Sequence, residues 1–262
     1  MAGPTTGADG IPSPAQRAAE LTKLGGFAVW QVHTVGLLTL TTALDADHLA
    51  ARFAATRSGL ARGTGLPAAK VPPRTAVSAA QIGLVSRLWS VALASVALHD
   101  WVPALTLPQV LVDRSHRNPS PLALRDPGSG RAVSGLEETV AAMEDLVVHG
   151  AVAAVTDACG KHGHTSGRVL VSNAASSLVS AARVVGGQVP GRAPFLDAVA
   201  RTLLQLPWLA AGGGYPCGTA ESERRRPDFR RTGCCLYYRL PGHGLCPDCI
   251  LVRPGRPGDE HH

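Results

Sequence analysis

Aromatic side chains are scarce in this sequence, where Phe, Trp and Tyr together make up 4% of the 262 residues. Hydrophobic residues nevertheless reach 45%, so a sizeable core is possible only if it is built from Ala, Val and Leu. Lysine is almost absent too, occurring only at Lys23, Lys70 and Lys161, so the net charge of +6 comes from arginine. Because arginine and alanine are enriched along the whole chain, we expect no nucleic-acid partner from the charge alone.

The sequence also lacks the signals of secretion and of membrane insertion. The residues before Arg17 contain neither a basic region nor an apolar run, so we expect no secretory leader. No run of about 18 uncharged apolar residues occurs, and we therefore expect no membrane span. We predict a cytoplasmic protein, in which the six cysteines favour metal or redox chemistry over disulfides.

Nucleotide-binding fingerprints are missing as well. Residues 63–65 read Gly-Thr-Gly but lack a preceding strand and a third glycine, and the glycines at 212–214 lack the strand and helix of a dinucleotide site. No P-loop is present. We therefore expect no NAD(P)H or ATP bound through a standard motif.

Apolar residues recur at helical spacing through most of the chain. This periodicity predicts helices over about residues 45–60, 77–98, 136–158, 167–185 and 194–205, with a Gly/Pro-rich connector at 63–75. Ser134 and Glu137 have the spacing of a capping box at the start of the third helix. Residues 105–113 alternate as in a strand, which we expect to pair with 122–124 across the Asn118-Pro119 turn. The fold class predicted is α+β, mostly α-helical with a small antiparallel sheet.

Four of the six cysteines lie close together near the C-terminus. Cys234 and Cys235 are adjacent, ten residues separate Cys235 from Cys246, and two separate Cys246 from Cys249. A C-x-x-C turn brings two sulfurs to one metal, and the Pro-Asp pair between these cysteines suits a tight turn. Adjacent cysteines diverge in extended chain, so they suit a centre with more than one metal atom.

Two cofactors remain open from the spacing alone. Four thiolates match the ligand set of a [2Fe–2S] cluster, and they also match a Cys₄ zinc site. Zinc ribbons usually show C-x₂₋₄-C on both sides, whereas this segment shows it on one. Before any resemblance is considered, cluster and zinc are about equally supported, and disulfides less so.

The stretch CCLYYRLPGHGLCPDC resembles the C-terminal signature of the FhuF-like ferric-siderophore reductases, with its CC-x₁₀-C-x₂-C spacing. The preceding FRR, the segment RTAVSAAQIGLVSRLWSVALASVAL at 74–98 with the DWVPAL that follows, and RVLVSNAASSLVSAARVV at 168–185 are similar to that family too. The resemblance implies a [2Fe–2S] cluster on Cys234, Cys235, Cys246 and Cys249. Pro247 departs from the glycine that is usual in the family, which removes a backbone N–H beside the cluster and leaves its reduction potential open.

This resemblance, together with the composition shift after residue 210, gives the expected domain organisation. We predict a flexible tail at 1–26, a mainly helical FhuF-like domain at 27–210, a linker and short [2Fe–2S]-binding segment at 211–253, and a flexible tail at 254–262. The resemblance implies one-electron reduction of Fe³⁺ in a ferric siderophore, of the hydroxamate type. Since no nucleotide motif is present, the electrons would come from a ferredoxin-like donor protein.

Two alternatives to the reductase stay open. One is a non-enzymatic iron–sulfur or zinc module, for instance a regulator that meets nucleic acid through its arginines. The other is a scaffold in siderophore biosynthesis.

Several further polar residues stand out in the sequence, and we interpret most of them as structural rather than as ligands. We interpret Cys159 and Cys217 as bystanders rather than ligands, and His162, His164 and His243 as loop residues. Gln81, Arg87 and Asn173 read as hydrogen-bonding residues at the edge of the core, and Tyr237, Tyr238 and Arg239 as residues that surround the cluster. The basic run reads as a solvated linker or as a docking patch for an acidic electron donor; it comprises Arg224, Arg225, Arg226, Arg230 and Arg231.

Overall fold

The computed structural model describes residues 12–31, 34–114, 116, 118–215 and 229–252. The fold is α+β and mostly helical with small antiparallel sheets, as predicted. The α-helices are α1 Pro14–Leu24, α2 Leu40–Ala43, α3 Ala46–Thr64, α4 Pro73–His99, α5 Gly135–Met143, α6 Ala153–Gly163, α7 Gly167–Gln188, α8 Ala193–Leu203 and α9 Pro207–Ala210. The strands are β1 Leu37–Thr39, β2 Trp101–Pro103, β3 Val110–Asp113, β4 Leu122–Leu124, β5 Gly130–Ala132, β6 Gly213–Gly214 and β7 Arg230–Arg231.

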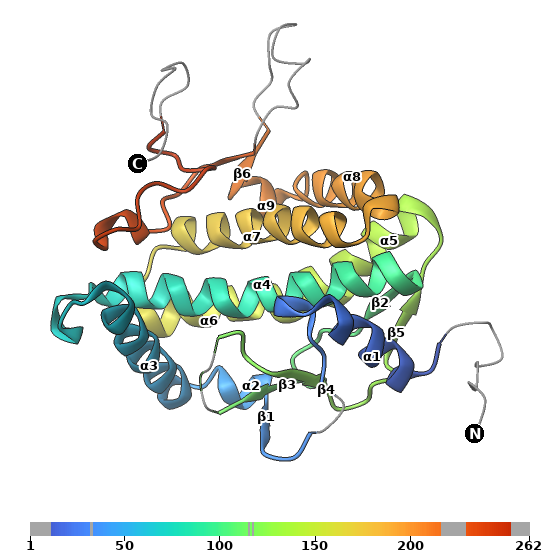
Figure 1. Cartoon of the computed structure of the whole chain (residues 1–262), viewed down its shortest axis with the longest axis horizontal. Helices are drawn as coiled ribbons and strands as arrows, with labels where there is room; N and C mark the ends of the chain where they lie inside the picture. Colours follow the sequence, from blue (N-terminus) through green and yellow to red (C-terminus); the bar gives the residue numbers. More distant parts are fainter. Residues whose placement is uncertain (1–11, 32–33, 115, 117, 216–228, 253–262) are drawn as a thin grey trace, which may run out of the picture.

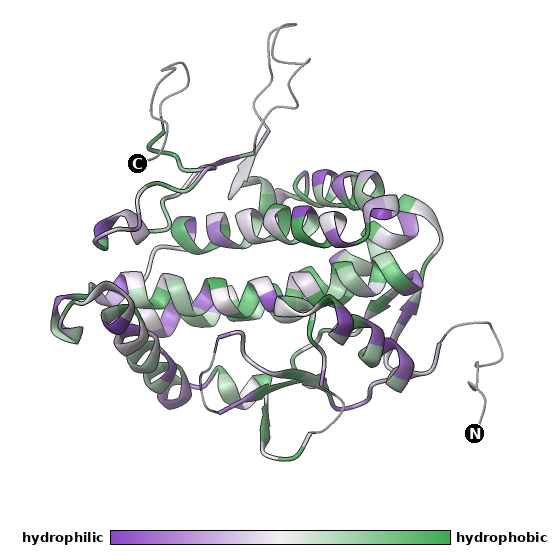
Figure 2. Cartoon of the chain, viewed as in Figure 1, coloured by the Kyte–Doolittle hydropathy of each residue, from purple (hydrophilic) through white to green (hydrophobic). Residues whose placement is uncertain are grey.

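Helices α4 and α7 form the centre of the molecule and lie side by side along most of their length (Figure 1). Helix α4 is mostly green and white in Figure 2, because it is apolar on nearly every face. Trp89 is fully buried in it and donates its indole N–H to the carbonyl oxygen of Ala174 at 3.1 Å. Apart from Trp30 and Phe229, the rest of this buried core is mainly aliphatic, as the shortage of aromatic residues predicted.

Short turns of other kinds connect these elements. They are the 3₁₀ turns Gly26–Ala28, Ala68–Lys70, Pro190–Arg192 and Tyr237–Arg239, and a π-helical segment at Glu144–Val152 between α5 and α6.

The helix predicted over 136–158 is interrupted by this π-helical segment. Gly150 leaves helical geometry with ψ −113°. The backbone N–H of the next residue, Ala151, donates to the carbonyl oxygen of Leu105 at 2.8 Å. A Cβ at Gly150 would collide with that carbonyl, so glycine permits the close approach.

The main sheet has the strand order β1-β3-β4 and is antiparallel throughout. The predicted pairing of residues 122–124 with the preceding strand is confirmed, with Val110 opposite Leu124. The strand itself is shorter than predicted, because residues 106–109 form a turn in which Gln109 donates to the carbonyl of Thr106. Strands β2 and β5 pair separately, as do β6 and β7.

Three local predictions were wrong. The predicted tail at 1–26 contains helix α1, whose start is fixed by a capping box between Ser13 and Gln16. The Ser134 side chain does not cap α5; the backbone N–H of Ser134 instead donates to the Glu138 carboxylate at 2.8 Å. Helix α7 continues through the two glycines at which we predicted its end and stops at Gln188. The predicted tail at 254–262 lies outside the described residues.

Three helical stretches are long and apolar enough to cross a membrane by length and composition, namely Pro73–His99, Gly135–Gly163 and Gly167–Gln188. Our sequence criterion asked for an unbroken uncharged run and did not detect them. In this fold their most apolar windows are 78%, 56% and 72% buried, which is what central core helices show. The absence of a membrane span stays a prediction.

Candidate iron–sulfur site

The cysteine-bearing segment 229–252 lies against the N-terminal halves of α4 and α7 (Figure 1). The Ser78 hydroxyl on α4 donates to the carbonyl oxygen of Cys235 at 2.8 Å. On α7, the Ser172 hydroxyl is 3.1 Å from both the carbonyl oxygen and the amide nitrogen of Gly233. These bonds fix the backbone directly before and within the first cysteine pair.

Glycine is needed where this segment meets α7. A Cβ at Gly233 would lie 2.6 Å from the carbonyl oxygen of Arg168, a distance that real Cβ atoms do not show. The Arg168 side chain in turn donates to the carbonyl oxygen of Thr232 at 2.8 Å. The backbone around the first cysteine therefore packs directly on the backbone of a core helix.

A buried ion pair links the two ends of the segment. The Arg231 Nε donates to the Asp248 Oδ2 at 2.9 Å, and the two side chains are only 7% and 17% exposed. The same guanidinium donates to the Asn173 Oδ1 at 2.8 Å and to the Ser176 hydroxyl at 2.7 Å, both on α7. Such charge-assisted, multidentate bonds are strong and directional, so they set the position of Asp248 between the last two cysteines.

The hydrogen-bond network extends from Asn173 into the core. Its amide nitrogen donates to the Ser78 hydroxyl at 2.9 Å and to Gln81 Oε1 at 3.1 Å. Gln81 donates onward to the carbonyl oxygen of Leu170 at 3.0 Å. The interpretation of Gln81 and Asn173 as hydrogen-bonding residues is confirmed, although both are fully buried rather than at the core edge.

Arg87 also has the structural role that we expected. Its Nε donates to the carbonyl oxygen of Ser120 at 2.8 Å, and its terminal nitrogens donate to the carbonyl oxygens of Phe27 and Val29. Burial lowers the pKa of Arg87 to about 10, which leaves it charged at neutral pH.

Two of the four thiol groups are in direct contact. The Sγ atoms of Cys235 and Cys246 are 3.3 Å apart. The hydrogen bond between them lowers the pKa of Cys235 to about 6 and raises that of Cys246, because one thiol donates to the thiolate of the other. The contact thus favours a thiolate within this pair, which is the form in which a cysteine binds metal.

Backbone N–H groups face the other two sulfurs. The amide of Leu236 donates to the Cys234 Sγ at 3.3 Å, and the amide of Leu251 to the Cys249 Sγ at 3.5 Å. Leu236 adopts φ +70° to do so. Burial is the main cause that raises the pKa of Cys234. Hydrogen bonds of this kind to ligating sulfurs tune the potential of iron–sulfur clusters.

The donor set can be tested against the two candidate cofactors. Two thiolates on one tetrahedral metal would lie about 3.8 Å apart, given metal–sulfur bonds of about 2.3 Å. The Cys235–Cys246 separation of 3.3 Å therefore requires a small opening to admit a metal atom. Within the described residues no group of three or more His, Cys, Asp or Glu stands ready to hold a single metal ion. Two sulfurs in contact and two further cysteines on the same short segment supply the four thiolates that a [2Fe–2S] core needs.

The remaining residues of the cysteine loop behave differently from one another. Tyr237 is half-buried, and burial raises its pKa to about 12. His243 is exposed and packs edge-on against the Tyr237 ring, which agrees with a loop residue. Tyr238 is 44% exposed, and Arg239 lies over its ring in solvent, so these two do not enclose the cysteines as we predicted.

The other candidate ligands lie elsewhere. Cys159 is completely buried in α6, where desolvation raises its pKa to about 12, so it is a bystander as predicted. His162 and His164 lie at the end of the same helix and belong to no metal-binding group among the described residues. Cys217 falls outside the described residues.

The interpretation of the arginine run as solvated or docking residues was wrong for Arg231, which is buried in the ion pair with Asp248. Arg230 is half-buried in strand β7. Arg224, Arg225 and Arg226 lie outside the described residues. Asp248 was not predicted as an anchoring residue. The one local signal for it was a carboxylate inside C-x-x-C together with an arginine shortly before the first cysteine.

Comparison with known proteins agrees with this site. No curated protein matches the chain. Residues 231–249 match the family described as the FhuF 2Fe-2S C-terminal domain, and these bounds begin at Arg231 and end at Cys249. The match therefore contains all four cysteines and the ion pair that joins the ends of their segment. The C-terminal segment of this chain is thus similar to the iron–sulfur domain of the FhuF-like family, which confirms the resemblance of this stretch to that family.

Proposed function

We propose that this protein reduces the Fe³⁺ of a siderophore by one electron, using a [2Fe–2S] cluster bound by Cys234, Cys235, Cys246 and Cys249, and releases Fe²⁺. The observation that carries the proposal is the match of residues 231–249 to the FhuF 2Fe-2S C-terminal domain. The anchoring of that segment on two core helices supports it, because fixed cysteines favour one defined cluster site.

When bound, the cluster supplies one-electron redox chemistry. The chain holds the four thiolates in place through the Arg231–Asp248 pair and the bond from Ser78 to the carbonyl of Cys235. The amides of Leu236 and Leu251 stabilise negative charge on the sulfurs that they face. Pro247 has no N–H to add to these donors.

The substrate assignment follows from ligand chemistry. Hydroxamate oxygens are hard ligands that hold Fe³⁺ much better than Fe²⁺. One added electron lowers the charge on iron and loosens the complex, so no general acid is required for release. Since no nucleotide motif was found, we propose a ferredoxin-like protein as the electron donor, in the cytoplasm.

The alternatives gain little from the described residues. A regulator that binds nucleic acid through its arginines would need these side chains exposed, but Arg231 is buried and paired. A biosynthetic scaffold would not need four cysteines anchored at a core helix.

The test is turnover by the anaerobically purified protein. With NADPH, ferredoxin reductase, ferredoxin and a ferric hydroxamate, a ferrous chelator should report steady formation of Fe²⁺. Omitting ferredoxin should stop turnover, because the protein does not oxidise NADPH itself. A colourless protein with stoichiometric zinc, or NADPH oxidation by the pure chain, would contradict the proposal. Cys159→Ser serves as the control variant, since Cys159 lies apart from the site.

A further inference from the structure

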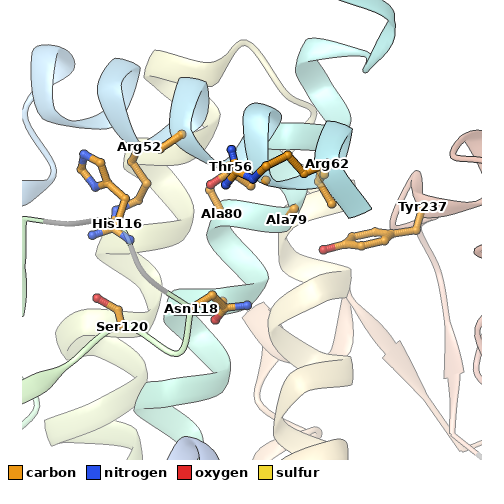
Figure 3. Close-up of a pocket in the computed structure, with 13 residues that line it drawn as sticks. Arg52, Thr56, Arg62, Ala79, Ala80, His116, Asn118, Ser120 and Tyr237 are labelled. Carbon is orange, nitrogen blue, oxygen red and sulfur yellow. The ribbon is translucent and has the colours of Figure 1, made fainter. Parts of the chain in front are cut away.

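A cavity of about 400 Å³ lies between α3 and α4, beside the cysteine segment (Figure 3). This is within the range of small-molecule sites. Its walls come from four parts of the chain: helix α3, helix α4, the loop between β3 and β4, and Tyr237 of the C-terminal segment. The polar lining residues are Arg52, Thr56, Arg62, His116, Asn118 and Ser120.

Buried polar atoms without partners line this cavity. The Ser120 side chain is 3% exposed, and its hydroxyl has no hydrogen-bond partner within the part of the chain that the structure describes. The same holds for the Nδ1 atom of His116, in that described part. Buried polar atoms are nearly always paired, and both residues line the cavity, so a small shift that exposes these two atoms would let a bound ligand supply the missing bonds.

The cavity is positively charged. Arg52 lines it and is 5% exposed, and Arg62, nearer the C-terminal end of α3, lines it too. No carboxylate lines it among the described residues, although Asp113 lies close to Arg52, which donates to its carbonyl oxygen at 3.4 Å. Burial, and then the charge of Arg52, lowers the pKa of His116, so that the imidazole is neutral. Hydrogen-bond donors with net positive charge select a ligand rich in oxygen acceptors and negative charge.

Tyr237 connects this cavity to the cysteine site. Its ring points from the C-terminal segment toward the cavity in Figure 3 and packs against the small cluster of Ala61, Val71 and Leu240. Its backbone N–H hydrogen-bonds to the Cys235 sulfur. One residue therefore borders both the cavity and a predicted cluster ligand, which places a bound molecule next to the cysteine segment.

We infer that this cavity is the substrate site, and that it binds a negatively charged, oxygen-rich ferric chelate, such as a hydroxamate siderophore that also carries carboxylates. The inference rests on the proposed reductase function and adds the location and the charge of the substrate. The chelate's oxygen atoms face Arg52 and Arg62, while Tyr237 borders it on the side of the cysteines.

A cavity-filling substitution tests the location. Gly59 lines the cavity, and a Cβ there would have only the Arg62 guanidinium within reach, at 4.0 Å. Gly63 is one turn further along α3, outside the cavity, with nothing within 4 Å. Gly59→Leu and Gly63→Leu should both fold, because each removes a helix-weakening glycine from α3 without a clash.

The binding assay uses Ga³⁺ chelates, which keep the charge of the ferric complexes but are not reduced. By calorimetry with the cluster-loaded protein, Gly59→Leu should weaken binding of a citrate-based dihydroxamate complex at least tenfold. Gly63→Leu should change it less than twofold. Arg62→Gln should weaken the same complex about five- to tenfold, but a neutral cyclic tris-hydroxamate complex less than twofold.

Equal binding by wild type and Gly59→Leu would overturn the location, as would a wild type that binds neither gallium complex. Tighter binding of the neutral complex by the wild type would overturn the charge assignment. Reduction measured in parallel separates this inference from the proposed function. If the wild type and Gly59→Leu reduce ferric chelates equally well, the reductase function is supported and the cavity is not the substrate site. If the wild type binds the gallium complex but reduces no ferric chelate, the reductase function is refuted and binding in the cavity is not.

Discussion

The helical core and the cysteine segment are held in place by different kinds of interaction. The core of the helical domain is built mainly from aliphatic side chains such as Leu88, Leu93 and Leu178, whose packing is not directional. The cysteine segment is fixed by directional bonds to Ser78, Ser172 and Asn173 and by one buried ion pair. The core therefore provides stability, and the polar contacts decide where the cysteines lie.

The segment contributes little apolar burial of its own. Phe229 joins the main core, and Leu240 forms a small separate cluster with Ala61 and Val71 of the helical domain. So short a stretch cannot bury enough surface to fold alone, and metal ligation commonly supplies the missing stability in such segments. The segment should thus depend on its cofactor far more than the helices do.

Removing a ligand should give the largest contrast between the two regions. Cys→Ser at 234, 235, 246 or 249 should abolish stable cluster binding, since four thiolates complete a [2Fe–2S] core. Iron and labile sulfide analysis should fall from about two of each per chain in the wild type to near zero. Circular dichroism should show the helical content unchanged, because the core does not rest on the cysteines.

Cys159→Ser is the matched control for this series. Cys159 is buried in α6 among core residues, so the serine should retain the full iron content and instead lower the stability of the helices, by about 1–3 kcal/mol for a buried hydroxyl. Full cluster loading in any of the four ligand variants would refute the ligand set.

The same division explains what could be predicted from the sequence. Helices α3, α4 and α7 were predicted because apolar periodicity is a local property of the chain. The four cysteines inside the matched segment were identified from their spacing, which is a local signal too, and their role as ligands stays a prediction. The break at Gly150 was missed, since it depends on the Leu105 backbone, which is distant in sequence.

The anchoring residues could not be predicted for the same reason. The one local signal for the Arg231–Asp248 pair, a carboxylate inside C-x-x-C and an arginine before the first cysteine, does not show that Arg231 reaches α7. Within a run of arginines, Arg231 was therefore interpreted as a solvated residue. Asn173 was singled out as polar on an apolar helix, but its partners Ser78 and Arg231 come from two other parts of the chain, distant in sequence. Long-range polar pairing leaves no periodic pattern in a single sequence.

Breaking the ion pair should have the second largest effect. Arg231→Met leaves the Asp248 carboxylate without its arginine partner in a mostly buried position, which costs about 3–5 kcal/mol for such pairs. The cysteine segment should detach before the helices unfold. Visible absorbance of the cluster should then be lost at a lower urea concentration than helical circular dichroism, whereas in wild type the two transitions lie closer together.

Arg239→Met is the control, because Arg239 is exposed in the same segment and its side chain makes bonds and ring contacts only with Tyr238 among the described residues. It should leave both transitions at their wild-type positions. If Arg231→Met behaved like Arg239→Met, the ion pair would not anchor the segment.

The smallest effect is expected from substitutions of two serines on helix α4, one bonded to the cysteine segment and the other to the helical domain. Ser78 and Ser86 both lie on α4 and both make side-chain hydrogen bonds, but Ser78 bonds to the Cys235 carbonyl whereas Ser86 bonds to Ser177 within the helical domain. Ser78→Ala leaves the buried carbonyl of Cys235 unpaired and removes an acceptor from Asn173, at a cost of about 1–3 kcal/mol. Ser86→Ala removes a partly buried hydroxyl pair, which costs about 1 kcal/mol or less. The two variants should therefore differ most in the half-life of the cluster in air, which Ser78→Ala should shorten several-fold while Ser86→Ala leaves it unchanged. Bleaching of the visible absorbance, followed at constant temperature alongside the urea midpoint of each variant, measures both quantities. Equal half-lives at unequal midpoints would mean that the hydrogen bond stabilises the helices and not the cysteine segment, so that the polar contacts would no longer be what positions the cysteines.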